Sequence, residues 1–377
     1  MKEIYFDAAA TTKPRKEVLE VFNELSLTTF ANSSSSHKLG FEAESIINKS
    51  RSQIAKYLNC KSDEIIFTSG ATESNNLAIK GASYHNASWG KHLITTKAEH
   101  PSVLNVFSFL EKQGFEVTYI DYDKNGNLNL DQLSSSIKST TTLVSIMSVN
   151  NELGFIFPID KIYKIIKSKS KAILHTDATQ AIGKMNLDFP YDLLSFSLHK
   201  IEGLKGIGIL VKKSNVQLDP QNLGGEQEFG LRGGTSPVPL IGSSATAIRL
   251  TFQEVEKKVA NSTLIWDYLN DELSKIPEII VLSKKSGTPF ILSFALTNHK
   301  ASIISQALSD NNIFVGTKSA CSEKVHAYSS VVLNAGYSKE ISENVIRLSF
   351  SGEESLEDAK YFITKLKEIL NTTKGRN

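Results

Sequence analysis

The sequence predicts an α/β fold, with a large domain on a mostly parallel seven-stranded sheet and a smaller α/β domain towards the C-terminus. Strand-like and helix-like runs alternate from about residue 60 to residue 212, and this alternation is typical of a parallel sheet with helices on both faces. The length of 377 residues suggests two domains or one large one. A content of 40 % hydrophobic and 22 % charged residues is that of a folded chain.

Seven short runs are the expected strands of the large sheet, because they are β-branched or aromatic and end in turn residues. They are Glu64–Thr68, His92–Thr96, Phe115–Ile120, Thr142–Val149, Ala172–Thr176, Leu193–Ser197 and Ile207–Val211. Helical patterns such as Val103–Gln113 and Ile159–Ser168 separate several of these runs. Ligands of such sheets bind beyond the carboxyl ends of the strands, so we expect functional residues where these runs end.

The last third of the chain has a different organisation. Ser214–Pro239 is rich in Gly, Pro, Gln and Asn and predicts a long loop, and loops of this length in compact domains are usually functional. A helical pattern then reaches about Ser274, and the short strands Glu278–Leu282, Ile291–Phe294 and Ile346–Phe350 alternate with helices. We expect residues 15–240 to form the large domain, and residues 1–14 with 241–377 to form the small one.

Charge and cysteine content exclude several classes of protein. Lys and Arg number 42 against 40 Asp and Glu, a net charge of +2 without a basic block, so no direct nucleic-acid partner is expected. No apolar run is long enough to span a membrane, and Met1–Asp7 does not resemble a secretory signal. The two cysteines, Cys60 and Cys321, rule out a disulfide framework or an all-cysteine metal site. We expect a cytoplasmic protein without a bound metal.

The first candidate site is the segment TSGATESNN at residues 68–76. A strand that ends at Thr68, a turn of small residues and a helix that begins near Ala71 would bring free N–H groups to one point, and Thr72 would add a hydroxyl. Such a helix N-terminus binds anions, phosphate above all. The alternative interpretation is an ordinary capped helix.

Two further segments complete the pattern of a pyridoxal phosphate (PLP) site. In HTDATQ an apolar strand leads to Asp177, which is either a helix cap or a charged partner for a ligand. In SFSLHK a strand leads to Lys200, and a lysine amine can bond to a carbonyl. PLP sites combine such a lysine with an acid that pairs with the pyridinium nitrogen. With the Thr72 turn for the phosphate, the three segments point to one ligand.

A histidine and a cysteine stand out beside these segments. His100, in AEHP, follows the His92–Thr96 run and is either a cap or a group that stacks on a cofactor ring and moves protons. Cys321, in KSACS, has small and polar neighbours, which favours an exposed thiol in a loop over inert packing. Cys60 follows an amphipathic helix, so we expect a structural role for it.

At these residues the sequence resembles the cysteine desulfurases of the class V aminotransferase-like family, nearly from end to end. The motifs that carry the resemblance are SGATESNNLAIKG at 69–81, EHPSVL at 99–104, VNNELG at 149–154, HTDATQ at 175–180, SFSLHK at 195–200, GLRGGTSPV at 230–238 and SACS at 319–322. The resemblance implies a PLP-dependent transferase of fold type I that works as a homodimer.

Residue roles follow from the resemblance by position. It implies that Lys200 is joined to the PLP aldehyde, that Asp177 pairs with the pyridine nitrogen, and that His100 stacks on the ring. The remaining cofactor contacts lie beside the ring hydroxyl and around the phosphate: Gln180 and Asn151 for the hydroxyl, and Ala71, Thr72, Ser197 and His199 for the phosphate.

The resemblance also implies contacts to the substrate and to a second subunit. Thr235 matches a threonine that reaches the phosphate of the other subunit. Arg347 matches the arginine that binds the substrate carboxylate, with Asn32 as its helper. The alternative for Arg347 is a surface ion pair of little energetic value. Cys321 matches the cysteine that receives the sulfur.

The implied reaction removes sulfur from L-cysteine, releases L-alanine and leaves a persulfide on Cys321 for an acceptor protein. The acceptor stays open, since iron–sulfur cluster assembly, tRNA thiolation and DNA sulfur modification all draw on this family. Alternatives are selenocysteine lyase or another PLP reaction on the same fold and, in a different class, a catalytically silent scaffold for sulfur trafficking. The sequence departs from the family pattern at Glu202 and Leu204, after the lysine, and at Glu226 and Phe229 in the long loop.

Overall fold

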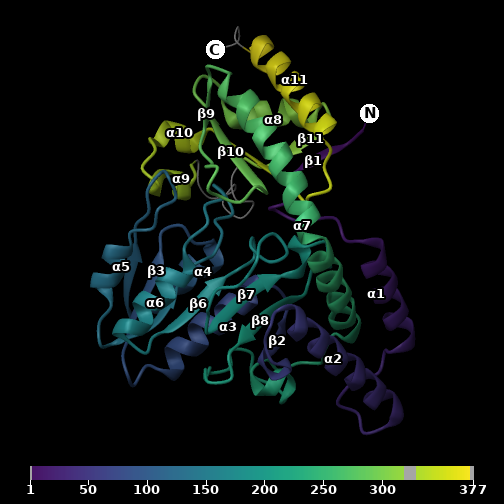
Figure 1. The fold of residues 1–377 in the computed structure, drawn as a ribbon. Helices are drawn as coiled ribbons and strands as arrows, with labels where there is room; N and C mark the ends of the chain where they lie inside the picture. The colour runs from purple at the N-terminus through teal and green to yellow at the C-terminus, as the bar shows by residue number, and fades with distance from the viewer. Residues whose placement is uncertain (1, 318–327, 374–377) are drawn as a thin grey trace.

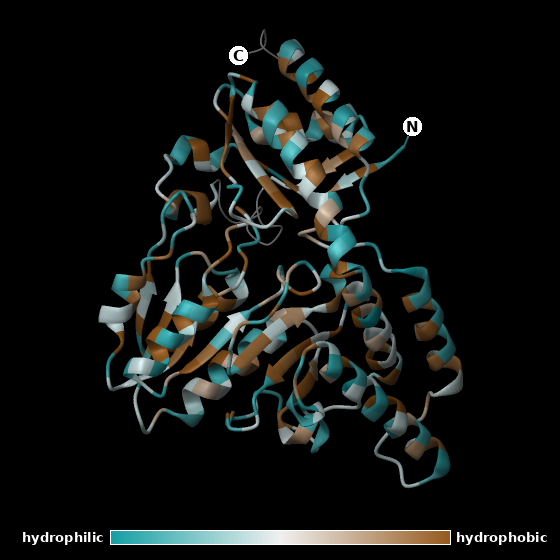
Figure 2. Ribbon diagram, in the orientation of Figure 1, coloured by the Kyte–Doolittle hydropathy of each residue, from teal (hydrophilic) through white to brown (hydrophobic). Residues whose placement is uncertain are grey.

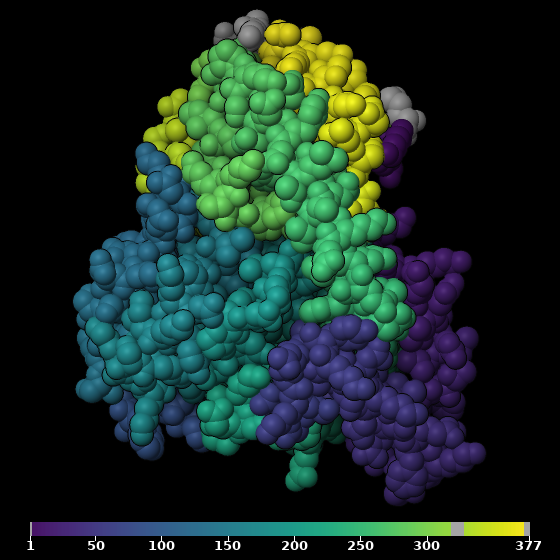
Figure 3. All heavy atoms as spheres, in the orientation of Figure 1, coloured from purple at the N-terminus to yellow at the C-terminus, as the bar shows by residue number. Residues whose placement is uncertain are grey.

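The computed structural model describes residues 2–317 and 328–373, which form two bodies joined by one long helix (Figure 1). The lower body in this view holds the large sheet, and the upper body holds two small sheets together with both ends of the described chain. In the space-filling view the C-terminal third of the chain, green to yellow, makes up the upper body (Figure 3). The predicted α/β class is confirmed.

The large sheet has seven strands in the order β2-β8-β7-β6-β5-β3-β4, and β8 alone runs antiparallel to its neighbours. The strands are β2 (Ile65–Thr68), β3 (His92–Thr96), β4 (Glu116–Ile120), β5 (Thr141–Ser145), β6 (Ile173–Asp177), β7 (Leu193–Ser197) and β8 (Gly208–Lys212). The mostly parallel seven-stranded sheet predicted from the sequence is therefore confirmed. All strands except β8 end at the same edge, and this edge faces the upper body.

One strand is shorter than the sequence predicts. The apolar run Thr142–Val149 suggested a single strand, but β5 ends at Ser145. The chain continues beside β6 outside the regular ladder, because Ile146 and Ser148 donate backbone hydrogen bonds to the carbonyls of His175 and Asp177 at 3.0 Å. Residues 146–149 are buried outside the strand, so the mostly apolar run that extends past Ser145 reflects burial and not strand structure.

Helices cover both faces of the large sheet. They are α1 (Lys16–Thr28), α2 (Lys38–Tyr57), α3 (Ala71–His85), α4 (Pro101–Lys112), α5 (Leu130–Ser136) and α6 (Ile159–Lys169), with short 3₁₀ turns at Ser62–Glu64, Leu198–Lys200 and Gln227–Gly230. Successive side chains of β7 point to opposite faces of the sheet. Leu193 packs against α3 and α4 on one face, and Leu194 packs against α2 and the long helix α7 (Val238–Ser274) on the other. Figure 2 shows the apolar strands enclosed between helices with polar outer faces.

The upper body has three antiparallel strands and one parallel pair. The antiparallel strands are β9 (Ile279–Val281), β10 (Ile291–Leu296) and β12 (Val345–Ser349), and the pair is β1 (Ile4–Phe6) with β11 (Ile313–Val315). Its helices are α8 (Ala301–Ser309), α9 (Ser330–Asn334), α10 (Lys339–Glu343) and α11 (Leu356–Thr373). The sequence analysis did not predict β1, which brings the first residues of the chain into this body.

The long helix α7 (Val238–Ser274) joins the two bodies. Its first half, around Ile241 and Ile248, packs against α1 and α2, whereas Ile265 and Leu273 belong to the apolar core of the upper body. A domain boundary at residue 240 stays a prediction, because α7 is continuous across it. None of the helices in the described ranges is long and apolar enough to cross a bilayer.

Candidate active site

A cavity of about 200 Å³ lies at the edge of the large sheet where the parallel strands end. Residues that follow β2, β3, β5, β6 and β7 line it, as expected for a sheet of this kind. Ten of the residues predicted from the sequence are brought together in this lining: Ala71, Thr72, His100, Asn151, Asp177, Gln180, Ser197, His199, Lys200 and Arg347.

One end of the cavity is built to hold an anion. The backbone N–H of Ala71, at the first position of α3, donates to Ser197 Oγ at 2.6 Å. Beside this contact the first residue of β8, Gly208, passes close to Gly70, and a Cβ at position 208 would lie 2.5 Å from the Gly70 backbone. The exposed Thr72 adds a hydroxyl beside the free N–H groups of the first turn. A phosphate group fits this end.

The carboxylate of Asp177 is held from two sides at the end of β6. Its Oδ1 accepts from the backbone N–H of Thr179 at 2.9 Å, and its Oδ2 accepts from Asn75 Nδ2 at 2.8 Å. Asn75 lies on α3 and is completely buried. The carboxylate is therefore fixed in direction, as an acid that pairs with a ring nitrogen must be.

His100 caps α4 and has a defined tautomer. Its Nδ1 lies 3.1 Å from the backbone nitrogen of Ser102 and 2.8 Å from the Ser102 hydroxyl. A backbone N–H can only donate, so Nδ1 is the acceptor and the proton of the neutral ring is on Nε2. Burial lowers the pKa of His100, and nearby Asp177 opposes this shift only in part. The neutral ring is suited to stacking on a cofactor.

Lys200 follows β7 in a short 3₁₀ turn and meets the N-terminal segment. Its Nζ donates to the carbonyl oxygens of Ala9 and Ala10, both at 2.6 Å. The neighbouring His199 contacts Thr11 Oγ1 through Nδ1 at 3.1 Å, and burial lowers the pKa of His199 to about 4. The lysine is thus held at the cavity by a turn that comes from the other end of the chain.

Arg347 is a buried member of the site. Only 3 % of its surface is exposed, so the alternative interpretation as a surface ion pair is wrong. Its Nη1 donates to the carbonyl of Asn151 at 2.9 Å, and its Nη2 donates to Asp7 Oδ1 at 2.6 Å. Within the described residues its Nε is buried without a hydrogen-bond partner. An unsatisfied guanidinium N–H at a cavity wall suits a substrate carboxylate.

Three predicted residues are not part of the lining. Asn32 and Thr235 are exposed, and the Asn32 side chain accepts a hydrogen bond from the Ser34 backbone at 2.9 Å. Cys321 lies outside the described residues. The roles expected for these three residues stay predictions.

The sequence analysis gave no role to several residues that hold the site together. Ala9, Ala10 and Asp7 come from the N-terminal turn, and Asn75 and Ser102 join Asp177 to His100. The segment DAAATT at residues 7–12 could have indicated this role. Its small side chains allow other groups to approach the backbone closely, and Asp7 adds a charge. Nothing local shows which strand ends this segment would meet.

These groups fit PLP. The structure provides an amine at Lys200, a fixed carboxylate at Asp177, an imidazole at His100, and a helix N-terminus with hydroxyls for a phosphate. The buried hydroxyl of Thr179, also in the lining, has no partner among the described residues. The amine matches the aldehyde of the cofactor, the carboxylate its ring nitrogen, the imidazole its ring face, and the helix N-terminus its phosphate.

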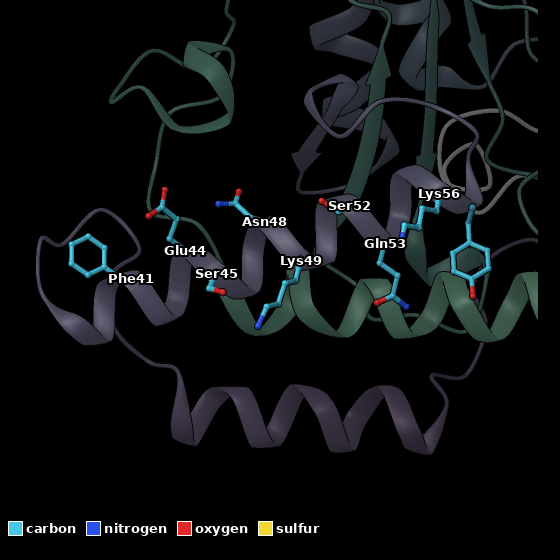
Figure 4. Close-up of a pocket in the computed structure, with 9 residues that line it drawn as sticks. Phe41, Glu44, Ser45, Asn48, Lys49, Ser52, Gln53 and Lys56 are labelled. Carbon is cyan, nitrogen blue, oxygen red and sulfur yellow. The ribbon is translucent and has the colours of Figure 1, made fainter.

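A larger hollow on the surface lacks this chemistry. It measures about 910 Å³ and follows the outer side of α2 (Figure 4). Its lining comes from that single helix, and its side chains include Asn48, Lys49 and Gln53, which do not converge on one point. In the described part of the chain no three His, Cys, Asp or Glu side chains are grouped to hold a metal ion. We therefore assign the chemistry to the smaller cavity.

Comparisons with known proteins show the family of this chain. The family model of aminotransferase class-V matches residues 4–362. A "NifS/IcsS protein homolog" of Lactobacillus delbrueckii subsp. bulgaricus is 40% identical over 372 residues, which cover 97% of each chain. A "Cysteine desulfurase IscS" of Dictyoglomus turgidum is 38% identical over 374 residues, 98% of this chain and 95% of that protein.

Solved structures show the same fold. A "NIFS-LIKE PROTEIN" superposes with a TM-score of 0.93 at 33% identity and covers 98% of this chain and 100% of its own. The structure "SspA in complex with cysteine" has a TM-score of 0.82 at 33% identity, and the match covers 94% of this chain and 100% of that chain. The family model spans nearly the whole chain, and the matches cover 95% or more of the length of these relatives. The chain therefore belongs to the class-V aminotransferase family, whose members are PLP-dependent enzymes.

Proposed function

We propose that this protein is a PLP-dependent cysteine desulfurase, which releases L-alanine and transfers the sulfur to its own Cys321. The observation that carries the proposal is the meeting of Lys200, Asp177, His100 and Arg347 around one cavity. The relatives named cysteine desulfurase support the choice of L-cysteine as substrate.

Each of these residues has a task in the reaction. PLP, when bound, supplies an electron sink for the negative charge that develops on the substrate α-carbon. Arg347 binds the substrate carboxylate, and its buried guanidinium makes this contact a strong one. Lys200 takes the proton from the α-carbon and returns it, because its amine is the base at the cavity wall. Asp177 accepts the ring N–H, and His100 stacks on the ring.

The sulfur step needs a thiolate nucleophile. Cys321 attacks the substrate sulfur, a sulfur–sulfur bond forms, and the carbon–sulfur bond breaks. The bonding electrons stay with the substrate carbon, which takes up a proton and leaves as alanine. The persulfide is then passed to an acceptor thiol. Burial raises the pKa of Cys60 to about 12, so this second cysteine is protonated at neutral pH and unsuited to the task.

The test measures alanine and sulfide formed from L-cysteine by the PLP-loaded protein. We expect Lys200→Ala to abolish both products and the visible cofactor band while the protein stays folded. Lys205→Ala is the matched control, because this exposed lysine lies in the same segment and does not line the cavity. Wild-type turnover by Lys200→Ala would refute the assignment, and a colourless, inactive wild type would favour the scaffold alternative. Selenocysteine offered as a second substrate tests the lyase alternative.

A homodimer is part of the proposal. Thr235 and Asn32 are exposed, although the resemblance places them at an active site. Helices α1 and α2, purple in Figure 3, extend from the lower body. Leu27 on α1, Phe30 between the two helices and Phe41 on α2 are 81%, 73% and 59% exposed. A second subunit would cover such apolar side chains. Sedimentation should show a dimer, and Thr235→Ala should weaken PLP retention more than stability. A monomer that retains PLP tightly would contradict this.

The sulfur acceptor and the location also remain proposals. We infer a cytoplasmic enzyme that passes sulfur to an acceptor protein, because its two cysteines fit a reducing compartment. The acceptor can be identified by trapping mixed disulfides with the persulfidated protein and sequencing the captured chains.

A further inference from the structure

Lys184 is a buried lysine that has no task in the proposed chemistry. It lies in a turn after β6 and is only 6% exposed. Its Nζ donates to Gln180 Oε1 at 2.9 Å and lies 5.9 Å from the centre of the Phe290 ring. Burial, with a smaller effect of nearby Lys200 and Arg347, lowers the pKa of Lys184 to about 7. A buried amine of this kind is costly, so its position requires an explanation.

The hydrogen bonds of Gln180 allow one orientation of its amide. The carbonyl of Ala9 can only accept, so the atom that faces it at 3.0 Å must be Nε2. Oε1 then faces Lys184, whose ammonium can only donate. A reversed amide would place oxygen against oxygen at Ala9 and would lose the bond to the protonated form of Lys184.

This orientation decides what the cavity receives from Gln180. Nε2 carries two hydrogens, and the bond to Ala9 uses one of them. Gln180 lines the cavity, so the second hydrogen is available to a group bound there. With the amide reversed, the cavity would meet a carbonyl oxygen instead. An N–H donor favours an acceptor with negative charge, such as a deprotonated ring hydroxyl.

We propose that Lys184 is a positioning residue for the cofactor: it secures the Gln180 amide so that an N–H points at the ring oxygen of PLP. Lys184 itself does not touch the cofactor and acts through Gln180. The inference rests on the proposed function, since the ring oxygen belongs to PLP and the place of Gln180 beside it comes from the family resemblance.

The experiment measures equilibrium binding of PLP and of its 3-deoxy analogue, which lacks the ring hydroxyl, to apoprotein. We expect Lys184→Met to weaken PLP binding roughly 5- to 10-fold, the loss of about one hydrogen bond. Binding of the 3-deoxy analogue should hardly change. Both ligands carry the phosphate, so a general loss of positive charge near the anion site would weaken them equally. Equal weakening, or none, overturns the proposal.

A second variant keeps the proposal testable if Lys184→Met does not fold. Gln180→Glu preserves the shape of the side chain but replaces the N–H that faces the cavity with an oxygen. PLP affinity should fall at least as far as in Lys184→Met, and affinity for the 3-deoxy analogue should be retained. Unchanged PLP affinity in Gln180→Glu refutes the role of amide orientation. Wild-type apoprotein that binds neither ligand refutes the proposed function itself, which separates the two failures.

Discussion

Arg347 and Asp7 form an ion pair between two strands of the upper body, with Nη2 and Oδ1 2.6 Å apart. Arg347 lies on β12, and Asp7 follows β1. The pair is possible because residue 316 beside it is a glycine. Any other residue at this position would place its Cβ 2.8 Å from Asp7 Oδ1. Asp7 compensates the buried positive charge and orients the guanidinium, so the side chain of Arg347 is held in one direction at the cavity wall.

Arg347→Lys should raise the KM for L-cysteine about 10-fold or more with a smaller change in kcat. An ammonium cannot reproduce the forked contact with a carboxylate, and hydrogen bonds to charged groups contribute about 1.5–3 kcal/mol. Steady-state kinetics give KM, and the binding of cysteamine, which lacks the carboxylate, is the control. If cysteamine binding weakens as much as cysteine binding, Arg347 does not hold the carboxylate.

His100 should be a neutral Nε2–H imidazole near pH 7. Its Nδ1 accepts from the backbone N–H of Ser102, and burial lowers its pKa. Long-range ¹H–¹⁵N NMR should show one protonated and one unprotonated ring nitrogen for the signal that disappears in His100→Gln. A doubly protonated ring near neutral pH, or a proton on Nδ1, would contradict the hydrogen-bond pattern.

The two cysteines should differ sharply in their role. Cys321→Ser should keep the coloured cofactor, lose the persulfide and lower alanine release by orders of magnitude. Cys60→Ser should leave the rate almost unchanged, because burial keeps the Cys60 thiol protonated. Mass spectrometry after brief exposure to L-cysteine locates the added sulfur. An adduct on the peptide of Cys60, or activity in Cys321→Ser, would require a different mechanism.

Lys184 should make stability depend on pH. Its pKa is about 7 in the folded protein and about 10.4 in an unfolded chain. Between these values the unfolded state binds more protons, so this contribution to stability rises with pH, and the penalty is complete below pH 7. Relative to wild type, Lys184→Met should therefore be most stable near pH 6 and lose this advantage towards pH 10. Urea unfolding across this range tests the trend, with the exposed Lys171→Met as control; a flat difference would refute it.

Glu202→Gln should destabilise the protein by about 2 kcal/mol, because the buried Lys258 and the partly buried Arg15 lose the carboxylate that they share and keep only Glu353 and Glu254. Glu202 Oε2 accepts from Arg15 Nε at 2.6 Å and from Lys258 Nζ at 2.7 Å. These bonds join the residues after Lys200 to the N-terminal segment and to α7. Urea unfolding measures the free energy of unfolding of the variant, and Glu256→Gln, at an exposed position on α7, is the control. A loss no larger than in the control would show that the cluster is energetically neutral.

The sequence by itself determined the sheet and the centre of the site. Short runs of five to eight residues that end in turns indicated a mostly parallel sheet, and the carboxyl ends of parallel strands meet at one edge. Asp177 ends a strand, and Lys200 and His100 lie within four residues of a strand end, so their convergence followed from local pattern. Arg347, and the role of Cys321 in receiving sulfur, came from the family resemblance, whereas the small polar neighbours of Cys321 singled out only its thiol.

Only the tertiary structure decided which distant segments hold these residues. Lys200 binds the carbonyls of Ala9 and Ala10 across 191 and 190 positions of sequence, and no periodicity records such a contact. Glu202 is a second example. This residue departs from the family pattern, and the structure explains it by the hydrogen bonds that Glu202 accepts from Arg15 and Lys258. Hydrogen bonds and ion pairs between remote segments depend on how strands and helices pack in three dimensions, whereas hydrophobic periodicity reports the face that each segment buries.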